Sequence, residues 1–598
     1  MAFLERGKEL LGTGVIGWKN HGHSEDRPCC GVDAFVDFVA FLVILSTIQC
    51  PRQAQGPFLF PAGNSLAETI LVSDLRNASS GERLLAITLQ GKINSMKESQ
   101  IYLLLAEWDL FWLDRLREKG YIRTTVEADL QGLLDRYGDI FDTAVVPDDH
   151  VPATINVATM MAALSNAIVV EPQCLDLLAG EKRLEDLRGR WQRDVDAYRW
   201  AKVHLWPEMN PKVLACYNPS SCPHFLRDYL VSNKIFTFWI TSQDGEDRTV
   251  SFHEEEKAFA ESLFLATSPP TPILGFWHSG SDPGIHEYTG VGWAGEYGVL
   301  TVPCDFATNM SLLSGVRSDL SRAVKHYHAR SDAAKISLDQ GKVYVAFHVI
   351  ESGDAPSYWQ NRQYKVWEDP VRGSVPIHWS LGPGLLELMP PIAEWFLEHA
   401  SARDQFFLGI SGAAYVHPYR GLFQKTNDPE GLWVEYLSLT GNYLRILGLD
   451  AVGLYTDSWK PFIRDSQDPV TLRFAEGIPG IRFLLLGMGR DHGVTVSNAI
   501  YELGRDRVMV CHILTRWLPE WTRFSRQEQI DWLVREIRCQ TPEIRPAFMN
   551  VMALSWVYGP EEIQAVLRGL GDSYQAILLP EMKTLLLEAR QLGPLGEK

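Results

Sequence analysis

The chain has 598 residues, of which 46% are hydrophobic and 22% charged, the composition of an ordinary globular protein. Because domains usually contain about 100–200 residues, this length predicts three to five domains, each with its own core. Lys and Arg number 56 against 74 Asp and Glu, and the formal net charge of −18 disfavours nucleic acid and anionic membranes as partners.

The first 56 residues are expected to be a leader. Segment 38–48 (FVAFLVILSTI) is the strongest apolar run of the chain. It is shorter than the ~20 residues of a membrane-spanning helix, and its length suits the core of a signal peptide. Acidic residues precede it and no small-residue cleavage site follows, so a buried helix or a misplaced start codon is the alternative. We expect a secreted protein, or one held outside the cell by this anchor, ahead of a cytoplasmic one.

Two further patterns agree with an oxidising, extracellular location. Cys216 and Cys222 are close enough in sequence to close a small disulfide loop. Asn77-Ala-Ser and Asn309-Met-Ser are acceptable N-glycosylation sequons, so a glycoprotein is expected.

Residues 57–338 alternate short β-rich runs with helical ones, which predicts α/β units around mostly parallel sheets. We expect modules at 57–165 and 166–269, then a small, partly β module at 270–338. Within them, segment 84–89 is predicted as a strand and segment 184–204 as a long helix.

Residues 339–598 carry eight apolar runs, most of them followed by a helical stretch. This rhythm over about 250 residues predicts a (β/α) barrel, with an open doubly wound sheet as the alternative. The runs are 343–350, 375–379, 406–410, 452–455, 481–486, 508–513, 547–552 and 576–579. The expected helices are 385–399, 432–447, 527–538, 560–570 and 580–592.

Polar and aromatic residues follow these runs, at the strand ends where barrel enzymes place their chemistry. Two carboxyl groups hydrolyse a glycosidic bond, and aromatic rings stack on sugars. The candidate catalytic residues are Glu351, Asp354, Asp457 and Asp491. The candidate substrate-binding residues are Tyr358, His378, Trp379, Tyr415, His417, Trp459, His492 and Trp556. Each also has a structural explanation, because Asp is a turn and capping residue, and His and Trp often lie in cores.

The preceding modules are expected to supply one wall of the cleft. Trp277, His278 and Glu287 are the candidates, because they follow an apolar run in a Gly-rich context.

The loop 412–418 (GAAYVHP) resembles the signature of the GxGYxYP family of putative glycoside hydrolases. Gly412, Tyr415 and Pro418 match the signature, whereas Ala414 replaces its second Gly and His417 its second Tyr. Segment 351–358 is similar to the Ser-Asp-Gly-Asp-Asn-x-Gln-Tyr segment of that family. There Gly353, Asp354 and Tyr358 match, while Ser352 and Ala355 differ. Segment 305–311 and the Leu-Gln-Gly stretch at 89–91 resemble further family pieces in the same order.

This resemblance implies a multi-domain α/β protein that hydrolyses an oligo- or polysaccharide without a cofactor or metal. Asp354 is the preferred catalytic carboxylate and Asp457 its preferred partner. One alternative is a metal-dependent carbohydrate deacetylase that uses Asp354 with His378, His417 or His492 as ligands. The other is a non-catalytic carbohydrate-binding or scaffold protein.

Overall fold

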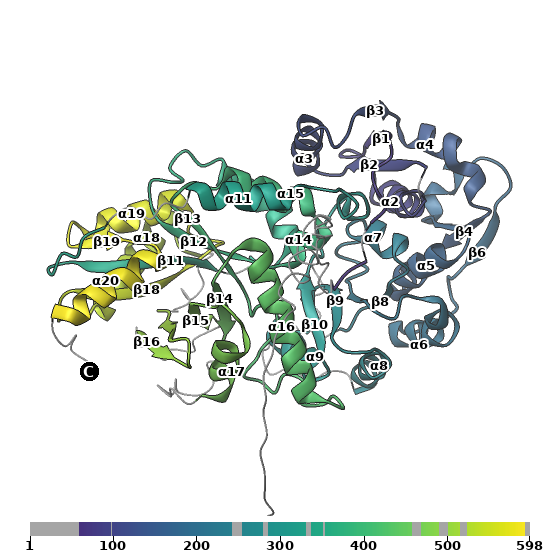
Figure 1. The fold of residues 1–598 in the computed structure, drawn as a ribbon. Helices are drawn as coiled ribbons and strands as arrows, with labels where there is room; N and C mark the ends of the chain where they lie inside the picture. The colour runs from purple at the N-terminus through teal and green to yellow at the C-terminus, as the bar shows by residue number, and fades with distance from the viewer. Residues whose placement is uncertain are drawn as a thin grey trace, which may run out of the picture. The chain divides into compact units, whose positions relative to one another are not determined.

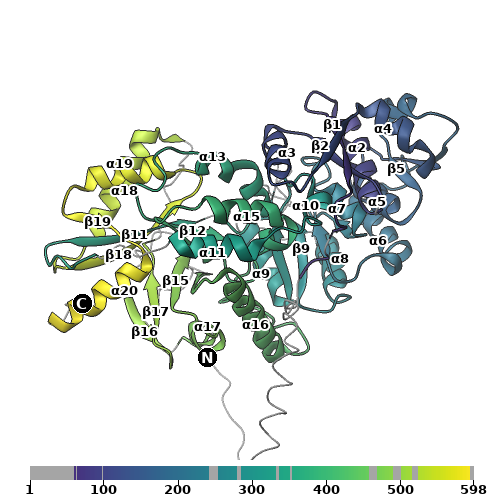
Figure 2. The same ribbon diagram turned by 45° about the horizontal axis from the view of Figure 1, so that its top comes forward.

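The computed structural model describes most of the chain from residue 59 to residue 592 (Figures 1 and 2). The described ranges are 59–61, 63–96, 98–241, 254–278, 285–330, 336–350, 353–456, 468–488, 500–514 and 523–592. The expected leader therefore lies outside the described residues. Among the described residues, no helix has the length and apolar character needed to cross a membrane.

Three small parallel sheets precede the C-terminal one (Figure 1). The first has the order β2-β1-β3 and the second β5-β4-β6, while the third has four strands in the order β10-β9-β7-β8. The strands of the first two are β1 Thr69–Asp74, β2 Gln100–Leu104, β3 Thr124–Glu127, β4 Thr143–Val146, β5 Ala167–Val169 and β6 Arg183–Asp186. Those of the third are β7 Leu214–Cys216, β8 Phe236–Phe238, β9 Thr271–Gly275 and β10 Val299–Pro303. Their parallel pairing agrees with the expected α/β units.

These sheets do not follow the expected module limits. Strands β4 and β5, on either side of residue 165, pair in one sheet. Strands β7 and β9, on either side of residue 269, pair in another. Composition marks breaks between elements, and a proline-rich stretch such as 268–272, which leads into β9, can equally lie between two strands of the same sheet.

Segment 84–89 was predicted as a strand, and this is wrong, because it lies inside helix α2 (Ser80–Asn94). Ser79 starts the helix with a capping box, in which its hydroxyl accepts from the Glu82 amide and the Glu82 carboxylate accepts from the Ser79 amide. The helix is buried on nearly all sides, so its apolar residues show no helical period. Segment 184–204 is likewise only partly helical, with β6 preceding α6 (Asp194–His204).

The C-terminal region forms one curled, half-barrel sheet of nine strands (Figure 2). Its order is β16-β17-β15-β14-β13-β12-β11-β18, and β19 pairs with the start of β11. The strands are β11 Val343–Ile350, β12 Ile377–Leu381, β13 Asp404–Leu408, β14 Ala451–Tyr455, β15 Phe483–Met488, β16 Ile500–Leu503, β17 Val508–His512, β18 Ala547–Leu554 and β19 Tyr574–Ala576. All pair in parallel except β16, which is antiparallel to β17.

All eight predicted runs overlap strands, but a regular eight-stranded barrel is not established. The last run, 576–579, overlaps strand β19 only at Ala576, and its last residue already begins helix α20 (Leu579–Leu592). Among the described residues, a single bridge from Leu514 to Val551 joins the β17 and β18 segments, and no ladder is formed there. The expected helices correspond to α14 Gly384–Leu388, α15 Pro390–His399, α16 Pro429–Leu447, α18 Arg526–Gln540, α19 Pro560–Leu570 and α20. Helix α11 (Leu320–Arg330), which follows the third sheet, packs along α15 (Figures 1 and 2).

Two sequence expectations about an oxidising location do not match the structure. Cys216 and Cys222 are both buried thiols, so the predicted disulfide is wrong. Asn309 is fully buried. Its amide donates to the Leu103 carbonyl (2.8 Å) and to Asp109 Oδ1 (3.0 Å), so it is no glycosylation site in the folded chain. Asn77 is exposed.

Glu387 on α14 holds the first described segment of the chain, at Phe60. Its Oε2 accepts from the Phe60 amide at 3.0 Å, and its Oε1 accepts from the Tyr443 hydroxyl. Burial raises the pKa of this carboxyl to about 7. The folded chain therefore keeps a proton that the unfolded chain has already lost above about pH 4.3.

Replacing Glu387 with Gln should make stability less dependent on pH. Between about pH 4 and pH 7 the folded parent binds more protons than the unfolded chain, so this group lowers the free energy of unfolding as pH rises. Glu387→Gln lacks that contribution. The free energy of unfolding of the variant minus that of the parent, measured by urea denaturation, should therefore increase by about 1–3 kcal/mol from pH 5 to pH 8. A difference independent of pH would contradict the raised pKa.

Candidate functional site

A pocket of about 240 Å³ lies where two sheets direct the carboxyl ends of their strands. The third sheet contributes residues that follow β9 and β10. The C-terminal sheet contributes residues that follow β11, β13 and β18. The lining residues are Phe276, His278, Glu287, Pro303, Asp305, Phe306, Asp354, Ala355, Ser357, Tyr358, Asn361, Ile410, Tyr415 and Trp556. Loops beyond parallel strands are the usual location of active sites in α/β proteins.

Asp354 lines this pocket, on a turn four residues beyond β11. The turn needs glycine, because a Cβ on Gly353 would lie 2.1 Å from the Ser380 carbonyl oxygen. The Gly353 carbonyl accepts from Trp359 Nε1 (2.7 Å) and from the Gly382 amide (2.8 Å), which holds the turn in place. Asp354 is 7% exposed, and burial together with the negative charge of Glu287 raises the pKa of its carboxyl to about 7.

Asp305 lines the pocket from the other sheet, two residues beyond β10. It is 6% exposed, and burial raises the pKa of its carboxyl to about 7. The backbone amides of Asp305 and Phe306 act in the opposite direction, by stabilising the anion. The pocket thus holds two carboxyl groups that keep a proton close to neutral pH.

Glu287, the first residue of helix α9 (Glu287–Glu296), is the third carboxyl group of the pocket. Its Oε1 accepts a hydrogen bond from the Tyr415 hydroxyl at 3.0 Å. Tyr415 is held across the two sheets, because its amide donates to the Thr301 carbonyl of β10 at 3.0 Å. The helix N-terminus and the tyrosine hydroxyl both favour the ionised form of Glu287.

The loop that carries Tyr415 is shaped by Gly412, whose φ of +104° is unfavourable for other residues. A Cβ there would also lie 2.8 Å from Thr440 Oγ1 of helix α16. The Ser411 hydroxyl donates to the Val416 carbonyl (3.1 Å) and accepts from the Tyr455 amide (2.8 Å), which ties the loop to β14. The loop is therefore a rigid support for Tyr415.

Aromatic side chains form the rest of the wall and the rim. Tyr358 is buried, and its ring centroid lies 5.4 Å from that of Trp556. Trp556 is 39% exposed and Phe306 37%, so both present ring surface to solvent at the pocket. The Arg362 guanidinium lies over the Trp556 ring, 4.6 Å from its centroid.

His417 lies behind Tyr415 and does not line the pocket. Its ring stacks on Tyr455, with centroids 4.2 Å apart. Neither of its ring nitrogens has a hydrogen-bond partner in the described part of the chain. Burial, together with the nearby Arg420, holds the pKa of His417 well below its usual range, so the ring is neutral.

Three sequence candidates lie in the core instead of the pocket. His378 Nδ1 bonds the Phe347 carbonyl (2.9 Å), and its Nε2 accepts from the Leu579 amide (3.0 Å). Trp379 donates to Asp404 Oδ1 at 2.8 Å. Trp277 donates to Thr301 Oγ1 at 3.0 Å. Strand residues alternate between faces, so adjacency to a strand end does not decide which way a side chain points.

The expectation that a preceding module supplies one wall is confirmed for His278 and Glu287, which line the pocket. Of the remaining candidates, Asp354, Tyr358, Tyr415 and Trp556 are brought together here. Glu351, Asp457, Trp459, Asp491 and His492 lie outside the described residues.

The sequence reasoning missed Asp305, Ser357, Asn361 and Phe306. Asp305 and Phe306 lie three and four residues beyond the apolar run 298–302, so looking past this run, as past the C-terminal ones, finds them. Ser357 and Asn361 lie on the short helices Pro356–Tyr358 and Trp359–Gln363, and no apolar period marks that segment as helical.

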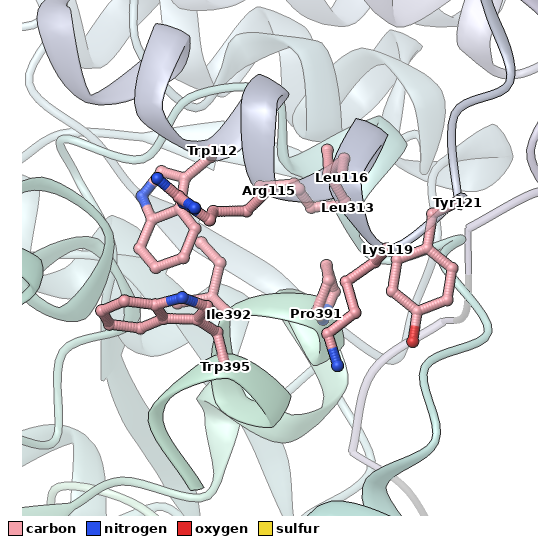
Figure 3. Close-up of a pocket in the computed structure, with 9 residues that line it drawn as sticks. All are labelled: Trp112, Arg115, Leu116, Lys119, Tyr121, Leu313, Pro391, Ile392 and Trp395. Atoms are coloured by element: carbon pink, nitrogen blue, oxygen red, sulfur yellow. The ribbon is translucent and has the colours of Figure 1, made fainter. Parts of the chain in front are cut away.

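Two other pockets are structural. A crevice of about 10 Å³ separates α3 (Glu107–Glu118) from α15, and Figure 3 shows Trp112, Arg115 and Leu116 facing Pro391, Ile392 and Trp395. It has room for about one water molecule. The second, of about 150 Å³, lies at the opposite strand ends and contains Asp404, Asp450 and Glu581. There Asp404 pairs with Arg372 (2.6 Å) and Glu581 with Arg403 (3.0 Å).

Replacing Tyr415 with Phe tests the contact to Glu287. Loss of the hydroxyl removes one hydrogen bond to a charged acceptor, worth about 1.5–3 kcal/mol. If Glu287 acts as an anion in a reaction at this pocket, the rate should fall by about tenfold to 100-fold. Thermal unfolding should show a folded protein, because the backbone bond of Tyr415 to Thr301 remains. A Tyr419→Phe variant is the control, because the Tyr419 hydroxyl bonds Thr471 Oγ1 at 2.8 Å and Tyr419 does not line the pocket.

Comparison with known proteins gives one family and one shared fold. Profiles of the GxGYxYP family match residues 69–139 (first N-terminal domain), 141–209 (second) and 211–315 (third). Its "putative glycoside hydrolase C-terminal domain" matches residues 341–586. A crystal structure of a putative hydrolase from Bacteroides thetaiotaomicron VPI-5482 is 18% identical, with a TM-score of 0.71 over 89% of this chain and 96% of that one. At this identity the similarity shows the fold alone.

A putative polysaccharide deacetylase from Mycobacterium smegmatis is 13% identical. It covers 44% of this chain and 97% of its own, with a TM-score of 0.28, at which no common fold is indicated. No curated protein matches the sequence significantly.

Proposed function

The chain belongs to the GxGYxYP family, and we propose that it is a glycoside hydrolase whose reaction takes place in the pocket between the third and C-terminal domains. The observation that carries this proposal is the presence of three carboxyl groups, Glu287, Asp305 and Asp354, in one aromatic-lined pocket. Hydrolysis of a glycosidic bond requires one carboxyl group that is protonated and one that is ionised.

Asp354 is the proposed general acid. A general acid must hold its proton near working pH, and burial with a negative neighbour gives Asp354 a pKa of about 7. Asp354 would donate that proton to the leaving-group oxygen as the glycosidic bond breaks.

Glu287 is the proposed nucleophile or general base. It accepts from the Tyr415 hydroxyl and begins a helix, and both features stabilise the carboxylate. As nucleophile it would attack the anomeric carbon, and water would later hydrolyse the glycosyl-enzyme; as base it would deprotonate the attacking water. The anomer of the first product, observed by NMR, distinguishes the two.

The metal-dependent deacetylase receives less support. Of its proposed ligands, His378 has both ring nitrogens engaged by backbone groups, and His417 lies behind the pocket. The ranges described above contain no group of three His, Cys, Asp or Glu side chains that could hold a metal ion.

The experiment is a hydrolysis screen of the full-length protein. Aryl glycosides of the common hexoses in both anomeric forms, and a panel of oligosaccharides, are incubated and the released aglycone or reducing ends are measured. We expect turnover of at least one class. Saccharide binding without turnover would favour the non-catalytic alternative, and release of acetate from acetylated saccharides would favour the deacetylase.

A further inference from the structure

Asp305 is a buried carboxyl group that the proposed reaction does not use. It lines the pocket and is 6% exposed, and the described residues offer it backbone amides but no basic side chain. Some other buried carboxylates are ion-paired, as Asp404 is with Arg372 (2.6 Å) and Glu581 with Arg403 (3.0 Å). Buried Asp109 instead accepts hydrogen bonds from the Thr308 hydroxyl and the Asn309 amide. A buried carboxyl group without a cation, facing a cavity, is a position that a ligand cation would stabilise.

The charge of the whole pocket favours the same ligand. Three of the described lining residues are acidic and none is Lys or Arg. Among the lining residues that the structure describes, His278 is the one basic side chain, and it is exposed. Arg362 lies on the Trp556 ring, outside the set of lining residues. The Glu287 carboxylate would therefore repel an anionic sugar and attract a cationic one, and a ligand ammonium would also favour the ionised form of Asp305.

The aromatic walls add to this attraction. Phe276, Phe306, Tyr358, Tyr415 and Trp556 surround the carboxyl groups. Aromatic faces attract an ammonium group through the ring quadrupole, most strongly where water is excluded, and the same faces stack on a sugar ring. A wall of this kind suits a ring that carries a positive substituent.

We propose that the pocket binds a sugar residue with a free, protonated amino group, and that Asp305 is the specificity residue that receives the ammonium. The identification of the ligand as a sugar rests on the proposed function, whereas its charge rests on the lining of the pocket. Glu287 and Asp354 keep their roles in the reaction, and Asp305 forms a charge-assisted hydrogen bond to the amine. N-acetylation of the sugar removes the positive charge of its amino group and with it the charge-assisted hydrogen bond to Asp305.

The test is binding, not turnover. Free glucosamine, glucose, N-acetylglucosamine and glucuronic acid, with their galacto counterparts, are titrated into the full-length protein at pH 6.5 and followed by ligand-observed NMR. Monosaccharides have no glycosidic bond to hydrolyse, so Kd is measured without catalysis. In the matching configuration the amino sugar should bind about tenfold more tightly than the neutral and N-acetylated sugars. The uronic acid should bind most weakly.

Two further measurements assign the preference to Asp305. Asp305→Asn should bring the Kd of the amino sugar to that of the neutral sugar and leave the latter within about twofold. Asp450→Asn is the matched control, because it removes a partly buried carboxyl group with a raised pKa from the pocket at the opposite strand ends. If Asp305→Asn does not fold, Asp305→Ser removes the same carboxyl group with a smaller side chain, and added NaCl tests the charge preference of the unaltered chain by weakening only the amino sugar.

Different results contradict the amino-sugar preference and the proposed glycosidase activity. Neutral sugars that bind as tightly as amino sugars, or are hydrolysed in preference to them, overturn the charge preference and leave the glycosidase in place. A preference that survives Asp305→Asn overturns the role of Asp305. If no saccharide is bound or hydrolysed, the proposed function fails as well.

Discussion

Replacing Asp354 with Asn should lower kcat/KM on the best substrate by at least about 100-fold, the loss typical of a removed general acid. The pH profile should change as well. The parent should lose activity as pH rises above about 7, because Asp354 then gives up its proton. Asn cannot titrate, so the residual activity of the variant should lack this alkaline limb.

The size of Asn makes this variant a clean test. Asn fills the same space, and the turn at Gly353 depends on bonds to Trp359 and Gly382 that do not involve the carboxyl group. Circular dichroism and thermal unfolding should match the parent. Asp450→Asn, at the opposite strand ends, should retain activity within about twofold. A fully active Asp354→Asn would remove Asp354 from the reaction.

Glu287→Gln should lower kcat/KM by about 10³-fold, within the range of losses caused by removing a positioned acid or base. The amide oxygen can still accept from the Tyr415 hydroxyl, so the support of the loop persists. The charge is lost, however, and with it the like-charge repulsion that helps raise the pKa of Asp354. The alkaline limb of the residual activity should therefore move to lower pH.

The control lies on the same helix. Glu296 ends α9, where it pairs with Lys425 at 2.7 Å, away from the pocket. Glu296→Gln should leave the rate and the alkaline limb unchanged. A Glu287→Gln variant with the parental rate, or with an alkaline limb that does not move, would contradict the proposed roles.

The C-terminal fold was largely predictable because its strands are short apolar runs separated by helices. Strand β11 is buried along its whole length, and helix α19 matches the predicted bounds 560–570. Closure of the sheet was not predictable, since it depends on side-chain packing between β17 and β18 and not on the number of runs. In the N-terminal part, helix α2 was mistaken for a strand because burial on nearly all its sides removed the helical period.

The site was predictable as a location but not as a set of residues. Asp354, Tyr358 and Trp556 follow strands and line the pocket, as expected. His378 satisfies the same rule, yet it points into the core. Glu287 and Asp305 reach Asp354 only because a separate sheet places its strand ends at the same pocket, and this depends on how domains pack.

The pocket is formed by residues encoded far apart in the gene. Glu287 and Asp305 belong to the segment that matches the third family domain, and Asp354 to the one that matches the last. A recombination event that transferred only the last segment would carry the proposed acid without its partner. The two segments must then be inherited together, and a substitution on one side of the pocket changes which substitutions are tolerated on the other.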